Sequence, residues 1–182
     1  MRVKELATRP SRVFAIVMTK GEHVTEGLEG FARETGVDAA AITAVGAVSE
    51  ATLGFFDPVA RDYLRIAVPV QAEVVSFQGD ITLADGGAPG LDDDAAANED
   101  RPRSGHDRSV HAHVVVSRSD GSTVGGHLLE ATVNPTLEVI VTESPAHLRR
   151  RYDPETGLAL IDLEHGDRVG HTITADVEVN GP

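Results

Sequence analysis

The sequence contains no cysteine, and this absence removes three kinds of chemistry. Disulfide bonds, thiolate metal sites and a cysteine nucleophile are all excluded. The absence also fits a reducing compartment, so we expect a cytoplasmic protein. No charged start is followed by an apolar core and a small-residue cleavage site, which argues against a signal peptide.

Long apolar runs and several catalytic motifs are missing as well. No run approaches the roughly 18 apolar residues that a membrane-spanning helix needs, so we expect no membrane association. The sequence has no G-x-S-x-G elbow, no Walker A loop, no H-E-x-x-H and no G-x-G-x-x-G. These absences argue against four classes of protein: hydrolases with a nucleophile elbow, P-loop enzymes, zincins and dinucleotide-binding folds.

Positive charge is scarce. Lys and Arg number 16 against 29 Asp and Glu, which gives a net charge of −13. Such a surface repels the phosphate backbone of nucleic acids. The one basic cluster, Arg149 to Arg151, falls in a stretch that we expect to be helical, and a solvated helix face explains it. The composition therefore argues against direct binding of nucleic acid.

A length of 182 residues suits one domain with a sizeable core. We assign this domain to residues 1–163. Residues 85–109 are rich in Gly, Pro and Asp and lack apolar periodicity, which predicts a mobile acidic insertion. This insertion is either a lid over a site or a tolerated surface loop. Residues 164–182 form a C-terminal extension, and the alternating apolar residues of 171–179 predict an edge strand within it.

Strand-like composition dominates the chain. It occupies residues 12–18, 39–56, 136–142 and two runs between 65 and 83 that are separated near Pro69 and Gly79. The first run is continuously apolar and predicts a buried strand. Gly46 and Gly54 predict bulges or points of close approach, and Asn134-Pro135 predicts a turn.

Two segments predict helices. Residues 22–35 have an apolar face of helical period and end at Gly36, a favourable residue after a helix. A second helix is expected from Ser144, followed by Pro145 at its first position, to about Tyr152. Many strands interrupted by two helices indicate the α/β (α+β) class, as a single domain with a mostly antiparallel sheet.

The strongest local turn signal is Asp120-Gly121, in the middle of a predicted β-hairpin. A three-residue loop of Ser119, Asp120 and Gly121, with Gly121 left-handed, would pair Arg118 with Ser122. A two-residue loop of Asp120 and Gly121 is the alternative, and it shifts the register by one residue.

The register of this hairpin decides where three histidines point. With the three-residue loop, His113 lies directly opposite His127, and His111 projects from the same face. With the two-residue loop, Val114 would face His127, and that histidine would point to the other face. We favour the first register, which brings the three imidazoles together.

Three converging histidines predict a metal site, because neutral imidazole is a common zinc ligand and three imidazoles leave a coordination position open. Other divalent transition metals accept the same ligands. The alternative is that these histidines only pair with carboxylates or backbone groups in a polar pocket. Gly125 and Gly126 precede His127 and are our candidates for cofactor binding, since a close approach to the backbone there could come from a ligand, a second subunit or a packed helix.

Other polar residues are ranked lower. Glu73 and Glu138 lie on other predicted strands and are candidate partners of the histidines or general bases. Five further histidines have no mutual spacing and are expected at the surface: His23, His106, His147, His165 and His171.

At this point the order of several motifs resembles a known family, the PPC (plants and prokaryotes conserved) domain. The matching blocks are R-V-F-A-I-V-M-T-K-G-E (12–22), F-A-R-E-T-G-V (31–37), A-V-G-A-V-S-E-A-T-L-G-F-F-D (44–57), E-V-V-S-F-Q-G-D-I-T-L (73–83), H-A-H-V-V-V (111–116) and V-G-G-H-L-L-E-A-T-V (124–133). Together they cover most of residues 12–142. The resemblance implies a strongly bent, largely antiparallel sheet and assembly as a homotrimer. In prokaryotic members with these histidines it implies a metal, usually zinc, on His111, His113 and His127.

The chain departs from the family in two places. Plant relatives bind AT-rich DNA through an Arg-Gly-Arg-Pro hook, whereas residues 100–103 read Asp-Arg-Pro-Arg and lack the glycine. The insertion at 85–109 is also longer than the connection usual in the family. We therefore expect a zinc-binding homotrimer that takes a small or anionic ligand. A DNA-associated regulatory protein and a zinc-dependent hydrolase are the alternatives, and whether the protein is an enzyme stays open at this stage.

Overall fold

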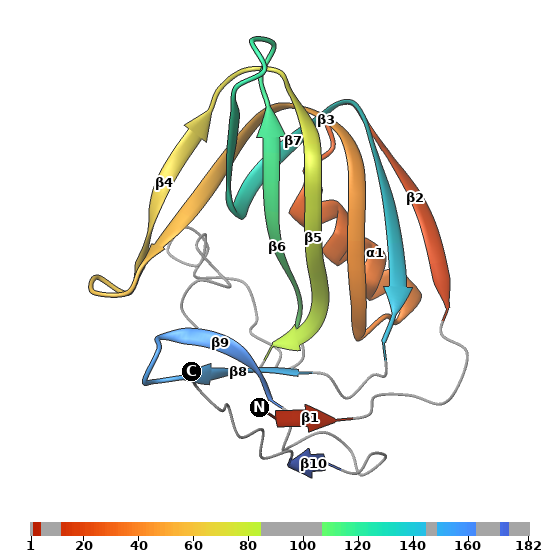
Figure 1. Ribbon diagram of the computed structural model, residues 1–182. Helices are drawn as coiled ribbons and strands as arrows, with labels where there is room; N and C mark the ends of the chain where they lie inside the picture. The colour runs from red at the N-terminus through yellow and green to blue at the C-terminus, as the bar shows by residue number, and fades with distance from the viewer. Residues whose placement is uncertain (1, 5–11, 85–106, 145–148, 163–171, 175–182) are drawn as a thin grey trace, which may run out of the picture.

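The computed structural model of the chain describes residues 2–4, 12–84, 107–144, 149–162 and 172–174. Within these ranges the fold is mostly β-sheet, with a single helix, α1 (Val24–Thr35) (Figure 1). The strands are β1 (Arg2–Lys4), β2 (Val13–Thr19), β3 (Ala39–Asp57), β4 (Asp62–Val68), β5 (Ala72–Ala84), β6 (Asp107–Ser117), β7 (Thr123–Glu143), β8 (Arg149–Asp153), β9 (Leu158–Asp162) and β10 (Thr172–Thr174). No helix in the described ranges is long and apolar enough to cross a membrane.

Four strands of the large sheet close on one another. β3 pairs with β7, β7 with β6, β6 with β5, and β5 again with β3, all antiparallel. β4 and β2 extend the sheet at β3 and β7, whereas β8 joins β5 in the parallel direction. The expected, mostly antiparallel sheet is thus present, and Figure 1 shows it strongly bent.

β3 joins two parts of the sheet because it changes partner along its length. Residues 39–48 pair with β5, and residues 51–57 pair with β4. Gly46 lies at a register shift in the first part and has φ of 148°. A Cβ atom at this position would collide with the carbonyl oxygen of Thr136, so only glycine fits. The predicted bulge at Gly46 is confirmed.

β7 is longer than the sequence predicts. The expected turn at Asn134-Pro135 is wrong, because β7 runs through both residues, which are joined by a cis peptide bond. Pairing with β3 passes from Val133 to Leu137, so Pro135 falls at an irregularity of the ladder. A proline, which has no N–H, is tolerated there because the regular ladder of backbone hydrogen bonds is interrupted.

α1 forms where the apolar period predicts it. Val24, Leu28 and Ala32 are buried on one face, and the helix contacts β6 and β7. Gly36 ends it in the left-handed conformation with φ of 68°, and its N–H donates to the carbonyl of Ala32. The predicted helix end is therefore confirmed.

The core is formed by side chains of α1 and of the large sheet. Its largest fully buried side chains are Phe77, Leu28, Ile42, Leu53, Ile81 and Leu137. Burying each of them stabilises the fold by about 1.5–3 kcal/mol relative to leaving it exposed. The prediction of a buried β2 is wrong. Val13 and Val17 are 63% and 62% exposed, because β2 pairs with β7 at an edge of the sheet and these two side chains point away from the core.

The second predicted helix is also wrong in its described part. Arg149–Asp153 is strand β8, which turns back into β9. Tertiary contacts outweigh local propensity here, since β8 pairs with β5 and Arg150 bonds to Asp80. Residues 145–148 lie outside the described residues, as do 85–106 of the predicted insertion. Within the predicted C-terminal extension, β10 pairs with β1 in a separate sheet.

Candidate metal centre

The turn between β6 and β7 has the predicted form. The backbone N–H of Arg118 donates to the carbonyl of Ser122 at 2.9 Å, and the N–H of Gly121 donates to the carbonyl of Arg118 at 2.9 Å. Gly121 has φ of 80°, the left-handed conformation. Asp120 Oδ1 accepts the N–H of Ser122 at 2.8 Å, which fixes the loop further. The three-residue loop is confirmed, and the two-residue alternative is excluded.

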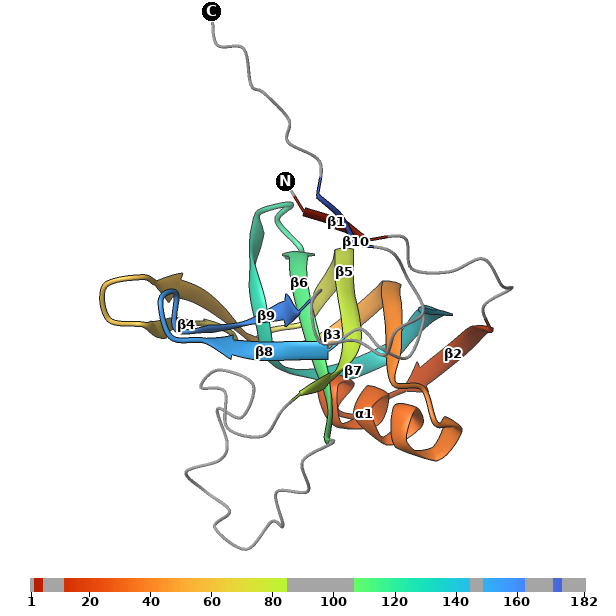
Figure 2. The ribbon, with the colours of Figure 1, turned by 90° about the horizontal axis from the view of Figure 1, so that it is seen from below.

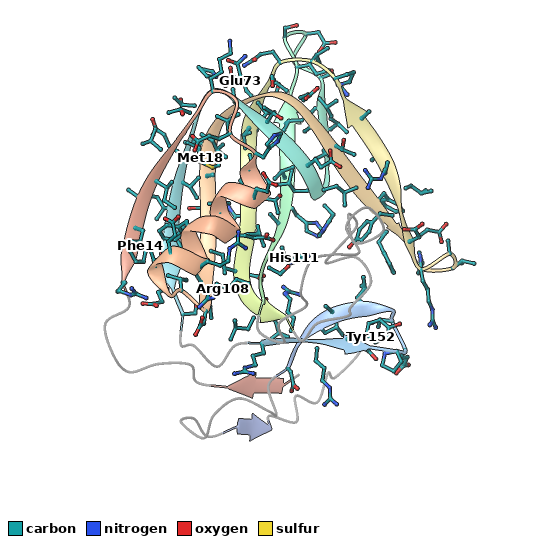
Figure 3. The ribbon with its side chains drawn as sticks, turned by 180° about the vertical axis from the view of Figure 1, so that it is seen from behind. Phe14, Met18, Glu73, Arg108, His111 and Tyr152 are labelled. Atoms are coloured by element: carbon teal, nitrogen blue, oxygen red, sulfur yellow. The ribbon has the colours of Figure 1, made fainter. Side chains whose placement is uncertain are left out.

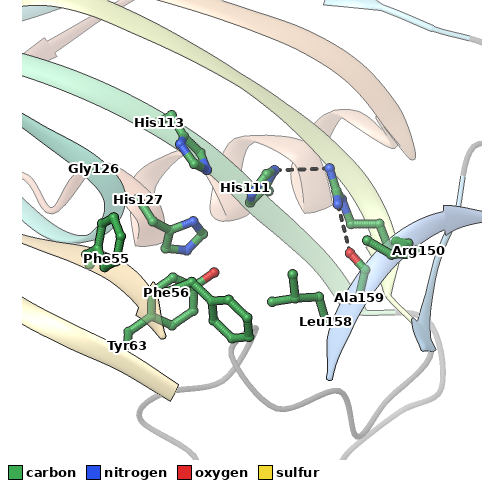
Figure 4. Close-up of a pocket in the computed structure, with 12 residues that line it drawn as sticks. Phe55, Phe56, Tyr63, His111, His113, Gly126, His127, Arg150, Leu158 and Ala159 are labelled. Atoms are coloured by element: carbon green, nitrogen blue, oxygen red, sulfur yellow. Dashed lines mark hydrogen bonds between the residues drawn. The ribbon is translucent and has the colours of Figure 1, made fainter. Parts of the chain in front are cut away.

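The three histidines converge as this register requires (Figure 4). His113 lies directly opposite His127, and His111 is two residues away on β6. The centroids of the three rings are between 5.1 and 5.5 Å apart. One ring nitrogen from each lies within 4.8 Å of the others. The alternate residues of β6 are buried in the core, namely Val110, Ala112, Val114 and Val116, so the histidines occupy the other face of the sheet.

His127 is the buried member of the cluster, with 6% of its surface exposed. Its ring stacks on that of Tyr63, with centroids 4.7 Å apart and 22° between the planes. Tyr63 can lie there because Gly54 has no side chain, since a Cβ atom on Gly54 would be 2.7 Å from the Tyr63 ring. The predicted close approach at Gly54 is confirmed, and the approaching group is an aromatic ring.

Burial also decides the charge of two histidines. Loss of hydration lowers the pKa of His127 to about 4, and the charges of His111, His113 and Arg150 act in the same direction. The pKa of His113 is lowered too, first by burial and then by His111 and Arg150. Both rings are therefore neutral at pH 7, which is the form that binds metal ions.

An ion pair lies beside His111. Asp80 of β5 is opposite His111 in the sheet, and its Oδ2 is 3.6 Å from His111 Nδ1. Arg150 of β8 donates from Nη2 to Asp80 Oδ2 at 2.8 Å and to His111 Nδ1 at 3.0 Å. A guanidinium can only donate, so Nδ1 of His111 accepts in this arrangement. Burial raises the pKa of Asp80, but its interactions with the neighbouring His111 and then with Arg150 outweigh burial and leave that pKa lowered.

The approach predicted at Gly125 and Gly126 comes from neighbouring strands. A Cβ atom on Gly126 would lie 2.6 Å from the carbonyl oxygen of Gly54 in β3. One on Gly125 would lie 2.9 Å from the carbonyl oxygen of Val114 in β6. The two glycines therefore let three strands lie close together beside His127. Gly126 also lines the pocket over the histidines, and a contact of either glycine with a cofactor stays a prediction.

The two carboxylates proposed as partners of the histidines are elsewhere. Glu73 is exposed, and Figure 3 shows it at the top of the sheet, away from His111. Glu138 is exposed on β7, opposite Val17 of β2. His23 is exposed, as expected. The remaining histidines, His106, His147, His165 and His171, lie outside the described residues.

Asp80, Arg150 and Tyr63 belong to the site although sequence reasoning did not find them. The signal for Asp80 was present, because it is a charged residue in the interior of a strand-like run. Placing it beside His111 needs the register of β5 with β6, and these strands are separated by residues 85–106. Arg150 was assigned to a helix face, and Tyr63 carried no motif.

The histidines line a cavity of about 510 Å³. One side is formed by aromatic residues of β3 and β4, and the other by Leu158, Ala159 and Leu160 of β9 together with Arg150 of β8 (Figure 4). Such a volume suits a small molecule. The arrangement can hold a divalent ion at the base of a pocket that is mostly apolar above it.

Solved structures of other proteins share this fold. A metal-containing protein from Archaeoglobus fulgidus is 27% identical, with a TM-score of 0.71 over 88% of this chain and 99% of its own. A proposed DNA-binding protein from Bacteroides thetaiotaomicron is 25% identical, with a TM-score of 0.69 over 90% of this chain and 99% of its own. A plant- and prokaryote-conserved (PPC) protein from Pyrococcus horikoshii is 23% identical, with a TM-score of 0.69 over 89% and 94%.

Sequence comparison agrees with the fold. The chain is 28% identical over 166 residues to the bifunctional protein GlmU of Synechococcus sp. (strain JA-3-3Ab). The match covers 90% of this chain but spans only 22% of the length of that protein. The sequence pattern of the Plants and Prokaryotes Conserved (PCC) domain matches residues 6–145, which is most of the chain. The protein therefore belongs to the Plants and Prokaryotes Conserved domain family, the one that its motifs resemble.

Proposed function

We propose that this protein binds a divalent transition metal, zinc in the first place, through His111, His113 and His127. The observation that carries the proposal is the convergence of three ring nitrogens within 4.8 Å of one another at the base of a pocket. Three neutral histidines with an open fourth position are a donor set that zinc sites use. The relative from Archaeoglobus fulgidus, named as metal-containing, supports the proposal.

The surroundings of His127 fit a bound ion. Its Nδ1 is buried and has no hydrogen-bond partner among the described residues. A buried polar atom without a partner is unfavourable, and an ion held by the cluster would offset that. The alternative, in which the histidines merely pair with carboxylates, accounts only for His111, which lies beside Asp80. It leaves His113 and His127 unexplained.

When bound, the ion would supply a localised positive charge and an open coordination position. Asp80 would then position His111. A ligating histidine carries a hydrogen on its second nitrogen and donates it to an acceptor. If that nitrogen is Nδ1, it can no longer accept from Arg150, and Asp80 Oδ2 becomes its acceptor. Metal binding would thus move one hydrogen bond of His111 from Arg150 to Asp80.

Metal content tests this proposal. Protein purified without a histidine tag and dialysed against zinc should retain one ion per chain, measured by inductively coupled plasma mass spectrometry. The double variant His111→Ala and His113→Ala should retain none, because one imidazole holds zinc weakly. A His23→Ala variant changes an exposed histidine outside the pocket and should keep the ion. Equal zinc in the wild type and the double variant would reject the proposal.

We further propose that the chain assembles as a homotrimer, as its family resemblance implies. Exposed apolar side chains gather on the outer face of β2, β3 and β7. Val13, Val17, Val45 and Ile140 are 63%, 62%, 59% and 46% exposed. A face of this kind indicates an interaction surface. Sedimentation equilibrium should give three times the chain mass, and the double variant Val17→Asp and Ile140→Asp should sediment as a monomer with unchanged circular dichroism.

A DNA-associated role is the second candidate, favoured by the relatives named as proposed DNA-binding proteins. The net charge of −13 opposes direct binding. The basic cluster of Arg149 to Arg151 also offers less positive charge to a DNA phosphate than its sequence indicates, since Arg150 is paired with Asp80. Titration of an AT-rich duplex at low salt tests whether the protein binds DNA directly. Binding that weakens as salt is added would support this role.

A further inference from the structure

The pocket over the histidines has walls with a definite chemistry. On one side, Phe55, Phe56 and Tyr63 come from the β3–β4 hairpin, and on the other, Leu158 and Leu160 come from β9. Phe56 and Tyr63 meet edge to face with ring centroids 5.4 Å apart, and Tyr63 in turn stacks on His127. The aromatic wall is therefore braced against the histidine cluster itself.

Part of this apolar lining is open to solvent. Leu160, on the β9 side of the pocket, is 42% exposed. Apolar side chains that line a pocket favour a ligand with an apolar body, because its binding removes their surface from water.

The charge in the pocket points to the other end of the ligand. Among the described lining residues, Arg150 carries the permanent charge, and its ion pair with Asp80 at 2.8 Å balances it. Imidazole binds a metal ion in its neutral form, so three such ligands would leave the charge of a bound divalent ion uncompensated. An anionic group would be attracted to it at the base of the pocket.

The β8–β9 hairpin, which carries these leucines, is held at its turn, beside the β3–β4 turn (Figure 2). Arg61, in the β3–β4 turn, donates from Nη1 to the carbonyl of Pro154 at 3.1 Å and from Nη2 to the carbonyl of Glu155 at 3.2 Å. Its side chain lies over Gly157, where a Cβ atom would be 3.2 Å from Arg61 Cδ. These contacts join the β3–β4 hairpin to the β8–β9 hairpin. The distance between the two sides of the pocket is therefore set before a ligand enters.

We propose that this pocket binds a small carboxylate with an apolar body. The carboxylate lies at the metal position, and the body lies between the aromatic residues of β3–β4 and the leucines of β9. Leu158 is then a specificity-determining residue. This inference rests on the proposed metal site.

Calorimetry with the zinc-loaded protein tests the inference, in a buffer without carboxylate or phosphate. Benzoate should bind about tenfold more tightly than acetate or better, since tenfold corresponds to about 1.4 kcal/mol and burial of a ring supplies more. Leu158→Asn should remove most of this preference. Leu64→Asn, which changes an exposed leucine of β4 outside the pocket lining, should leave it intact.

The failures are distinguishable. Absence of zinc in the wild-type protein would reject the metal site itself. If zinc is bound but benzoate and acetate bind equally, the ligand class is wrong. Equal affinity of benzoate for the zinc-loaded and zinc-free protein would also overturn the inference, because the carboxylate would not lie at the metal.

Discussion

Two of the hairpins that line the pocket, β6–β7 at its base and β8–β9 at one side, are held in different ways. The β6–β7 hairpin is fixed by its own turn and is continuous with the sheet on both sides, through β5 and β3. Among the described residues, the β8–β9 hairpin has two backbone pairs with the rest of the sheet, Leu83 with Arg149 and Ala84 with Arg150. Its position depends on side chains, chiefly those of Arg150 and Arg61.

The difference separates the two tasks of the site. The histidines lie on the hairpin whose geometry is locally determined, which suits a metal centre because its ligands must be precisely placed. Leu158 and Leu160 lie on the β8–β9 hairpin, which can change without disturbing the core. We therefore expect metal affinity to depend on the first hairpin, and ligand selectivity to depend on the second.

Acid should produce the largest effect, on the first hairpin. His127 has a pKa of about 4 in the folded protein against an ordinary value of 6.5, so the unfolded chain takes up its proton first as the pH falls. Its contribution to stability is therefore complete above pH 6.5 and is lost between pH 6.5 and about 4. The loss amounts to about 3 kcal/mol at 1.36 kcal/mol per pKa unit.

Urea unfolding of zinc-free protein at several pH values measures this loss. The His127→Asn variant is the control, because it keeps a polar side chain that does not titrate. Its unfolding free energy should fall less steeply than that of the wild type between pH 6.5 and 4. Parallel curves for the two proteins would mean that His127 titrates normally.

The next largest effect concerns Asp80, which lies beside His111 of the first hairpin and is paired with Arg150 of the second. Asp80→Asn should weaken zinc binding by about 10- to 100-fold, because the acceptor that orients His111 loses its charge. Competition with a chromophoric chelator measures this affinity. The matched control is Asp38→Asn, whose aspartate pairs with Arg108 outside the pocket lining. Unchanged zinc affinity in Asp80→Asn would remove Asp80 from the site.

The turn of the first hairpin gives a smaller effect. Gly121→Ala places a Cβ atom on a left-handed residue where nothing lies within 4 Å, so the change is purely conformational. We expect a loss of about 1–2 kcal/mol in unfolding free energy, with zinc stoichiometry unchanged. Ser119→Ala in the same loop should be nearly neutral. Loss of zinc from a folded Gly121→Ala protein would show that the sheet alone does not keep the register.

The smallest effect is expected at the tip of the second hairpin. Arg61→Ala removes two hydrogen bonds to carbonyl groups and should cost about 1 kcal/mol of local stability. Amide hydrogen exchange in residues 149–162 should accelerate about fivefold, as that energy implies. Arg65→Ala, which removes an exposed pair with Glu130, should not change it. Equal exchange in both variants would place the anchor of this hairpin elsewhere.

The same contrast explains what the sequence could predict. The register that unites His113 with His127 follows from Gly121 and its neighbours, because the turn and both strands lie within one short stretch. The helix ending at Gly36 was predictable for the same reason. In both cases the deciding contacts are local in sequence.

The rest depends on contacts between distant residues. Arg149–Asp153 has no strand pattern of its own, and it becomes β8 through pairing with β5 and the bonds of Arg150 to Asp80, 70 positions earlier. Pro135 reads as a turn, but it is accommodated in β7 where the pairing with β3 is irregular. Neither effect is visible in local propensity.

X-ray absorption at the zinc edge tests the central claim most directly. The zinc-loaded wild type should show three imidazole ligands, and His127→Asn should show one fewer while it remains folded. A ligand set without imidazole, or one that is identical in the two proteins, would contradict the proposed metal centre.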